Sequence, residues 1–375
     1  MIYLDHASSS QVEQAFAEAA QAMLPRFYAN PSAHHTLGYE INQAMEASRK
    51  KVSQAFGFSS DEVIFTASGS EAVNLAIKGI AIANQIKGKH IITVKTEHHC
   101  VLNSLQWLQE HLNFEVSQCS VDRDGHLDLV ELKRMIRPDT ILIAIMAVNN
   151  EIANIHPIDK IKQLMKEAKS KAVLFVDAIA AVGKIDQQLY MADVMAISQH
   201  KLGGLSGSGC LLKRRHILMT PLIHGGQQEH GLRGGTPFAV ANILFGDVVQ
   251  HALKMQQQQK SHITLLRNQL VNALKTKFNV EIVSDEAGSP YIVSFIQPNV
   301  HSSIILNVLN QQGVYVSSHS ACASDSKDVS HVLKACGYKH EQAIGMIRVS
   351  FHYDTTEKEI DGFLKAYEKV SDYVQ

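Results

Sequence analysis

Short runs of β-branched and other apolar residues alternate with longer segments in which apolar positions recur at helical spacing. Helical stretches such as 101–112 and 159–169 separate the apolar runs. This alternation is typical of an α/β fold with a doubly wound, mostly parallel sheet. We predict a seven-stranded sheet, with strands at residues 62–65, 90–94, 114–121, 140–148, 172–176, 194–197 and 209–212.

The pattern changes near four consecutive glutamines, Gln256 to Gln259, where the chain becomes polar. Because 375 residues exceed the usual size of one hydrophobic core, we expect two domains. The predicted division is an N-terminal segment, 1–13, that joins the smaller domain, a large domain at 14–257, and a smaller α+β domain at 258–375. The elements predicted for the smaller domain are helices at 262–278 and 356–373 and strands at 280–283, 291–295, 314–317 and 346–351.

Composition narrows the class of protein. The formal net charge is −1 and no block of like charge occurs, which argues against binding to nucleic acid or to an anionic membrane. No apolar run approaches the ~20 residues of a membrane helix, and the N-terminus lacks the basic and apolar regions of a secretion signal. Five cysteines without a Cys-x-x-Cys pair indicate reduced thiols and no structural zinc site. We therefore expect a cytoplasmic protein without a metal site.

Two apolar runs end in residues that suit a cofactor site. The run 173–176 leads into Asp177, and the run 193–197 leads into the segment that ends at Lys201. A lysine that forms a Schiff base and an acid that pairs with a pyridinium nitrogen are the two fixed points of a pyridoxal phosphate (PLP) site. Each residue alone has an ordinary alternative, because most lysines are solvated and an acid after a strand often caps the next helix. Together they make a PLP enzyme the leading hypothesis.

A turn of small residues, Ser68, Gly69 and Ser70, joins a predicted strand to an amphipathic segment. Small residues at such a turn let backbone N–H groups approach a phosphate, and the helix dipole favours an anion there. The turn is therefore a candidate phosphate cradle. The alternative, that a serine only caps the helix while Glu71 occupies its first turn, stays open.

The chain resembles the cysteine desulfurases of the class V aminotransferase family almost from end to end. Nine short motifs occur in the family's order, and so many in register leave little room for chance. They are Tyr3–Asp5, Asn30–Ser32 with Gly38, Thr96–His98, Val148–Ile152, Val176–Ala178, Ser198–Lys201, Arg233–Thr236, Ser317–Cys322 and Ile347–Arg348.

The resemblance implies a PLP-dependent transferase of fold type I that forms a homodimer and acts on L-cysteine. Lys201 would hold PLP and move a proton at the substrate Cα, and Asp177 would keep the pyridine nitrogen protonated. Arg348 would grip the substrate carboxylate with two parallel hydrogen bonds. His98 would stack on the ring and exchange protons, although a histidine that caps the following helix is an alternative. The other implied contacts are Asn150 to the ring oxygen or substrate, and Ser198, His200, Ser68–Ser70 and the partner subunit's Thr236 to the phosphate.

Cys322 would carry out the sulfur chemistry that the resemblance implies. Its thiolate would attack the sulfur of bound cysteine, which leaves a persulfide on Cys322 and yields alanine. The residue lies in a small, polar stretch before a helix that begins near Val329, and the length of this stretch resembles the branch that hands sulfur to several acceptors. The acceptor would be an iron–sulfur scaffold or a tRNA-thiolation enzyme. The other cysteines, at positions 100, 119, 210 and 336, are expected in the core.

Several positions depart from the family pattern. Ala180 stands where the family has a Gln that hydrogen-bonds to the ring oxygen, Ala153 replaces a usual Gly, and His319 replaces a Gly near Cys322. The segment 224–229 and the residues His6 and Ser8 to Ser10 also differ. Two alternatives therefore stay open: another class V PLP enzyme, such as a selenocysteine lyase or an aminotransferase, and a catalytically weak dimeric scaffold.

Overall fold

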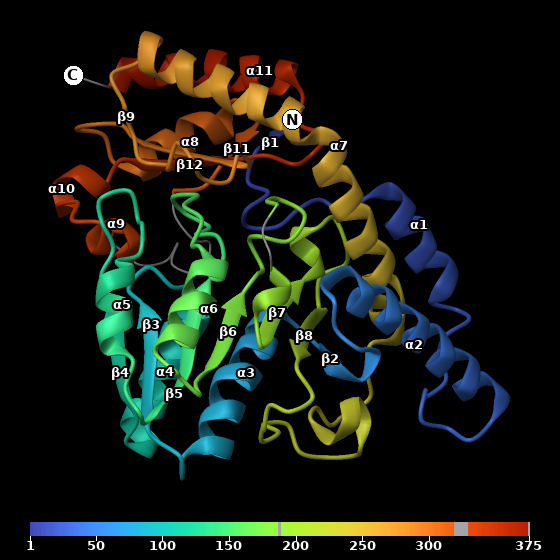
Figure 1. The fold of residues 1–375 in the computed structure, drawn as a ribbon. Coiled ribbons are helices and arrows are strands. Elements are labelled where there is room, and N and C mark those ends of the chain that lie inside the picture. Colours follow the sequence, from blue (N-terminus) through green and yellow to red (C-terminus); the bar gives the residue numbers. More distant parts are fainter. Residues whose placement is uncertain (187–188, 319–328, 374–375) are drawn as a thin grey trace.

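The computed structural model describes residues 1–186, 189–318 and 329–373. Its largest sheet has seven strands in the order β2-β8-β7-β6-β5-β3-β4, and β8 runs antiparallel to both neighbours while all other pairs are parallel (Figure 1). All seven predicted strands are present, so the α/β prediction is confirmed. They are β2 (Val63–Thr66), β3 (His90–Val94), β4 (Glu115–Cys119), β5 (Thr140–Met146), β6 (Val173–Asp177), β7 (Val194–Ser198) and β8 (Gly209–Lys213).

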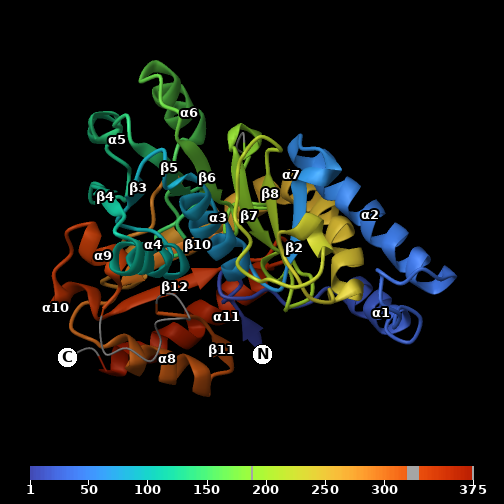
Figure 2. The ribbon, with the colours of Figure 1, turned by 90° about the horizontal axis from the view of Figure 1, so that it is seen from below.

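Helices cover both faces of this sheet, which explains why its central strands are apolar on both sides. One core contains residues of α3 and α4, and the other contains residues of α2, α5, α6 and the first half of α7. Figure 2 shows α1, α2 and α7 together at the β2 end of the sheet. The helices are α1 (Gln14–Met23), α2 (Thr36–Phe56), α3 (Gly69–Asn84), α4 (His99–Leu112), α5 (Leu129–Met135), α6 (Ile158–Glu167) and α7 (Ala239–Lys277).

The rest of the chain forms a second core that lies across one end of the large sheet (Figure 1). An antiparallel sheet in the order β12-β10-β9 and a parallel pair, β1 with β11, build it. The pair with β11 ties the N-terminal segment to this core, where Leu4 is buried. The elements are β1 (Ile2–Tyr3), β9 (Glu281–Ile282), β10 (Ile292–Ile296), α8 (Ser302–Gln311), β11 (Val314–Tyr315), α9 (His331–Ala335), α10 (His340–Ala343), β12 (Met346–Ser350) and α11 (Glu357–Tyr367).

Helix α7 corrects one sequence prediction. We expected a helix to begin at His262, after a polar break, but α7 runs unbroken from Ala239 to Lys277. The four glutamines do not end it, because glutamine has a good helix propensity. Residues 239–252 of α7 pack in the core that α7 shares with α2, α5 and α6. Residues 263–274 pack in the second core, which lies across the end of the large sheet. This packing supports the domain division near residue 258, which we propose.

Other differences are local. Two predicted strands, 280–283 and 314–317, are only two residues long, and Ser317 instead forms an isolated bridge with Arg348. The closing helix ends at Tyr367 and continues as a 3₁₀ turn. Ala153 has a φ of 67°, a left-handed conformation that costs a residue with a Cβ about 1–2 kcal/mol, which explains a family preference for glycine there. No helix within the described ranges combines the length and apolarity that crossing a membrane requires.

A buried ion pair fixes strand β2 from outside the sheet. The carboxylate of Glu229 accepts hydrogen bonds from Arg49 Nη1 at 2.7 Å, Arg49 Nη2 at 3.1 Å and the Phe65 N–H at 2.8 Å. Both charged side chains are only 4% exposed. Because Phe65 belongs to β2, this pair holds the strand that leads into the turn at Ser68.

We expect Glu229→Ala to lower the free energy of unfolding by about 3–5 kcal/mol, because it leaves the buried Arg49 charge unpaired. Chemical denaturation measures this loss. Glu46 is the matched control, since it pairs with the same arginine but is 48% exposed, and Glu46→Ala should cost less than about 1 kcal/mol. Equal losses of unfolding free energy in the two variants would contradict the expectation that the buried pair stabilises the fold more than the exposed pair does.

Candidate active site

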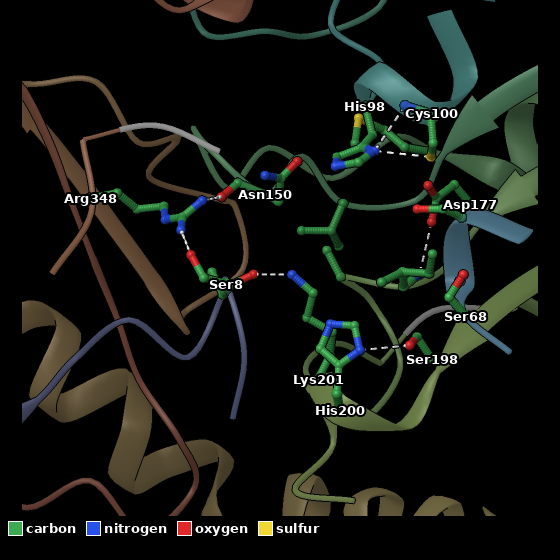
Figure 3. Close-up of a pocket in the computed structure, with 17 residues that line it drawn as sticks. Ser8, Ser68, His98, Cys100, Asn150, Asp177, Ser198, His200, Lys201 and Arg348 are labelled. Carbon is green, nitrogen blue, oxygen red and sulfur yellow. Dashed lines mark hydrogen bonds between the residues drawn. The ribbon is translucent and has the colours of Figure 1, made fainter. Parts of the chain in front are cut away.

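The carboxyl ends of several parallel strands meet at one cavity of about 160 Å³, as expected for an open α/β sheet. Figure 3 shows Arg348 and Asn150 on one side of it, Asp177 and Ser68 on the opposite side, and Lys201 between them. Among the described residues, every predicted site residue except Thr236 lines this cavity. Those that line it are Ser68, Gly69, Ser70, His98, Asn150, Asp177, Ser198, His200, Lys201 and Arg348.

The small-residue turn both caps α3 and faces the cavity. Ser68 Oγ accepts the backbone N–H of Glu71 at 3.1 Å, so the capping alternative is also correct. A Cβ at Gly69 would lie 2.5 Å from Ile179 Cδ1 and 3.2 Å from Ser198 Cβ, so the backbone approaches too closely for a larger residue. The first N–H groups of α3 therefore meet the cavity at the positive end of the helix dipole.

Asp177 is the last residue of β6 and is 5% exposed. Its Oδ1 accepts the Ile179 N–H at 3.0 Å. Burial raises the pKa of Asp177 from 3.8 to about 6, although this hydrogen bond and the positive charge of Lys201 act in the opposite direction. A buried carboxylate of this kind is stabilised by a cationic partner, as a protonated pyridine nitrogen would be.

Lys201 ends the short 3₁₀ turn after β7. Its Nζ donates to the carbonyl oxygen of Ala7, which brings the N-terminal segment to the cavity. Three residues before Lys201, Ser198 Oγ lies 2.9 Å from His200 Nδ1. Burial, followed by the charge of Lys201, lowers the pKa of His200 to about 4, so this ring is neutral at physiological pH.

His98 is the N-cap of α4, and its Nδ1 accepts the backbone N–H of Cys100 at 3.2 Å. A backbone N–H can only donate, so the neutral ring carries its proton on Nε2. Burial and then the charge of Lys201 lower the pKa of His98 to about 4. The ring is therefore neutral and can offer an N–H to a bound molecule.

Cys100 corrects a second prediction. We expected it in the core, but it is half-buried at the cavity wall, where its Sγ lies 2.9 Å from His98 Nδ1. Its position in the first turn of α4, two residues after His98, is the signal that could have placed it. The remaining described cysteines, Cys119, Cys210 and Cys336, are buried as predicted.

Arg348, in β12, is completely buried. Its Nη1 donates to the Asn150 carbonyl oxygen at 2.9 Å, and its Nη2 donates to Asp5 Oδ1 at 2.9 Å and to Ser8 Oγ at 2.7 Å. The Nε–H has no partner among the described residues. The guanidinium thus keeps a buried donor for a ligand, while Asp5 balances its charge.

The sequence reasoning gave no role to Glu97, which lies behind the cavity. It is fully buried, and its Oε1 accepts the Met146 N–H. Burial, followed by the charge of Asp177, raises the pKa of Glu97 well above its ordinary range. Burial therefore favours the neutral form of Glu97, and Asp177 is the carboxyl that lines the cavity. Its place inside the motif Thr96-Glu-His98, next to a site histidine, was the available signal.

One described residue of the predicted site, Thr236, is not part of this cavity. Thr236 is exposed and lies outside the lining. Cys322 and His319 lie outside the described residues. Apart from these, the donor set fits PLP: a helix N-terminus and serines for a phosphate, a buried carboxylate for a pyridinium, and a lysine for an aldehyde.

Comparisons with known proteins show which family the chain resembles over nearly its whole length. The profile of the class-V aminotransferases matches residues 2–363. A cysteine desulfurase, IscS of Dictyoglomus turgidum, is 37% identical over 374 residues, covering 98% of this chain and 94% of that protein. A solved NifS-like protein has a TM-score of 0.93 at 31% identity, with 99% of both chains covered. SspA, solved in complex with cysteine, has a TM-score of 0.81 at 29% identity, covering 94% of this chain and 99% of SspA.

The raised pKa of Asp177 predicts a pH-dependent effect in the protein prepared without PLP. A carboxyl whose pKa is higher in the folded state costs stability once it ionises, so this cost grows between pH 3.8 and about 6. Asp177→Asn should therefore be more stable than wild type at pH 8 by about 3 kcal/mol, at 1.36 kcal/mol per pKa unit. The two proteins should be equally stable below pH 3.8. Denaturant titrations at both pH values test this, and a pH-independent difference contradicts it.

Proposed function

The chain belongs to the class-V aminotransferase family, and we propose that it is a PLP-dependent cysteine desulfurase. The reaction converts L-cysteine to L-alanine and leaves the sulfur as a persulfide on Cys322. The observation that carries the proposal is the meeting of Lys201, Asp177 and Arg348 in one cavity of a chain that is 37% identical to a cysteine desulfurase.

We propose that the cavity holds PLP. Lys201 bonds to the aldehyde carbon, Asp177 pairs with the ring nitrogen, and the N-terminus of α3 binds the phosphate. When bound, PLP supplies an electron sink for the carbanion that remains when the substrate Cα loses its proton. Further contacts come from His98 to the ring, Asn150 to the ring oxygen or substrate, Ser68, Gly69, Ser70, Ser198 and His200 to the phosphate, and Thr236 of the partner subunit.

Each of three side chains in the cavity has a separate role toward the substrate. The Arg348 guanidinium binds the α-carboxylate, and its contacts with Asp5 and Asn150 hold it in place. Lys201 takes the proton from Cα as a neutral amine and returns it. His98 offers its Nε2–H to the bound molecule and, because it is neutral, adds no charge that repels Lys201.

Sulfur transfer is assigned to Cys322 from the sequence resemblance. Its thiolate forms a bond to the substrate sulfur while the Cβ–S bond breaks, and the electron pair stays on the substrate. Cβ then takes up a proton, so alanine is released and the sulfur remains on Cys322. An iron–sulfur scaffold or a tRNA-thiolation enzyme then accepts the sulfur.

We also propose that the protein is a cytoplasmic homodimer with composite sites. Thr236 is exposed in the single chain, and the neighbouring Phe238 is 49% exposed, so this segment can reach a partner's cavity. A reducing cytoplasm suits cysteines that form no disulfide, as is the case for Cys100, Cys119, Cys210 and Cys336.

The first test concerns the cofactor. Wild type incubated with PLP should show an absorption band in the near-ultraviolet to visible range, and borohydride should fix PLP on Lys201. Lys201→Ala should lose both signals, because it lacks the amine that bonds to the aldehyde. Lys171→Ala, an exposed control, should keep them. Mass spectrometry of the reduced protein locates the adduct, and an adduct elsewhere in the wild type refutes the assignment.

The second test concerns sulfur. Cys322→Ser should still bind PLP and respond spectrally to cysteine, yet lose most of its alanine production, because a hydroxyl is a poor nucleophile toward sulfur. Alkylation and mass mapping should find the extra sulfur on Cys322 in the wild type. Near-normal alanine release from the variant favours a selenocysteine lyase or another class V enzyme. No alanine release from wild type favours the scaffold alternative.

A further inference from the structure

A second, much smaller cavity lies next to Lys201. Its volume of about 20 Å³ is room for one water molecule. Ala7, Ile179, Ala180 and Lys201 line both this cavity and the larger one, so the two share a wall. The side chain of Ala180 ends at Cβ, whereas the family resemblance implies a longer glutamine side chain at this position.

Three buried polar atoms belong to residues that line the small cavity. His6 Nδ1, Ser289 Oγ and Tyr291 Oη have no hydrogen-bond partner among the described residues. The residues are 8%, 0% and 3% exposed, so bulk solvent does not reach them. Each unsatisfied buried group costs about 1–3 kcal/mol, and a buried water with about three hydrogen bonds is the usual way to satisfy such a set.

The acceptor in this set is His6. Its ring hydrogen-bonds to the backbone of Tyr3. Because Nδ1 is the nitrogen without a partner, Nε2 makes that bond as the donor. The neutral ring therefore presents a bare lone pair at Nδ1, and the hydroxyls of Ser289 and Tyr291 can donate or accept as required.

Lys184 brings a second amine to the same cavity. Its Nζ lies 4.6 Å from the centre of the Tyr291 ring. Burial, and to a lesser degree the charge of Lys201, lower the pKa of Lys184 to about 8, while Asp354 and Glu13 favour its charged form. Near neutral pH, Lys184 can therefore both accept and release a proton.

Beyond His6 the polar groups continue to the surface. The His6 ring stacks on His352 with 5.1 Å between ring centres, and His352 Nδ1 lies 2.6 Å from Asp354 Oδ1. The Asp354 side chain is 70% exposed. His6, His352 and Asp354 line an open cleft of about 450 Å³.

We propose that the small cavity holds one ordered water, which links Lys201 to Lys184 and carries protons between the active site and solvent. The Lys201 ammonium gives a proton to the water, and the water passes another proton to the Lys184 amine, so the water is unchanged. Lys184, which is only partly buried, then exchanges its proton with solvent. The water site stands on the geometry alone, and the relay rests on the role of Lys201 in the proposed function.

The water site is tested by a high-resolution crystal structure. A water within hydrogen-bonding distance of at least two of His6 Nδ1, Ser289 Oγ and Tyr291 Oη is expected in the wild type. The double variant Ser289→Ala with Tyr291→Phe should lose it. A dry cavity in the wild type overturns the proposal, whatever reaction the protein catalyses.

The relay is tested by the exchange of the Cα hydrogen of L-alanine with D₂O, followed by NMR on the PLP-loaded protein. Lys184→Met removes the amine, whereas Lys184→Arg keeps a positive charge that does not release its proton. Both should slow exchange on the order of 10- to 100-fold. Lys171→Met, at the opposite end of β6 from Asp177, should exchange like wild type.

Two outcomes separate the relay from simpler explanations. If Lys184→Met is slow but Lys184→Arg matches wild type, only the charge matters and the relay is wrong. If neither is slow while the water is present, the water has a structural role alone and the relay is again wrong. Failure of the proposed function looks different, because the wild type then releases no alanine from cysteine although the crystallographic water remains.

Discussion

The buried guanidinium of Arg348 is the contact on which the active-site cavity depends. It joins β12 of the smaller core to the Asn150 carbonyl of the larger one and to Asp5 and Ser8 of the N-terminal segment. A charge this deeply buried is tolerated only when carboxylate and carbonyl oxygens surround it. The same constraint that pairs Arg348 therefore brings three distant parts of the chain to one place.

Electrostatics then give each cavity group a definite protonation state. His98 and His200 are neutral because burial and the nearby Lys201 disfavour a further positive charge. Burial and the charge of Asp177 favour the neutral form of Glu97, and Asp177 is the carboxyl of the described lining that a cationic ligand can ionise. The cavity thus presents a single negative charge on its sheet side and separate cations at Lys201 and Arg348. Such separation suits a ligand that carries both signs of charge, as an amino acid does.

The sequence predicted the large sheet well because parallel strands covered on both faces must be apolar throughout, and such runs are easy to recognise. It also paired Asp177 with Lys201, since both follow strands whose carboxyl ends meet. It failed in the middle of α7, where four glutamines suggested a break that the helix does not have. The positions of two side chains at the site were also missed. Cys100 lies in a helical pattern that fits a core residue equally well. The raised pKa of Glu97 follows from tertiary burial, which the local sequence does not show.

The unbroken course of α7 has a mechanical consequence. At 1.5 Å per residue its 39 residues form a rod about 58 Å long, and each end is embedded in a different core. A hinge at this connection would have to break consecutive helical hydrogen bonds. Helix α7 is therefore a rigid connection between the two cores. Opening and closing of the cavity must then come from shorter segments at its rim rather than from one domain swinging against the other.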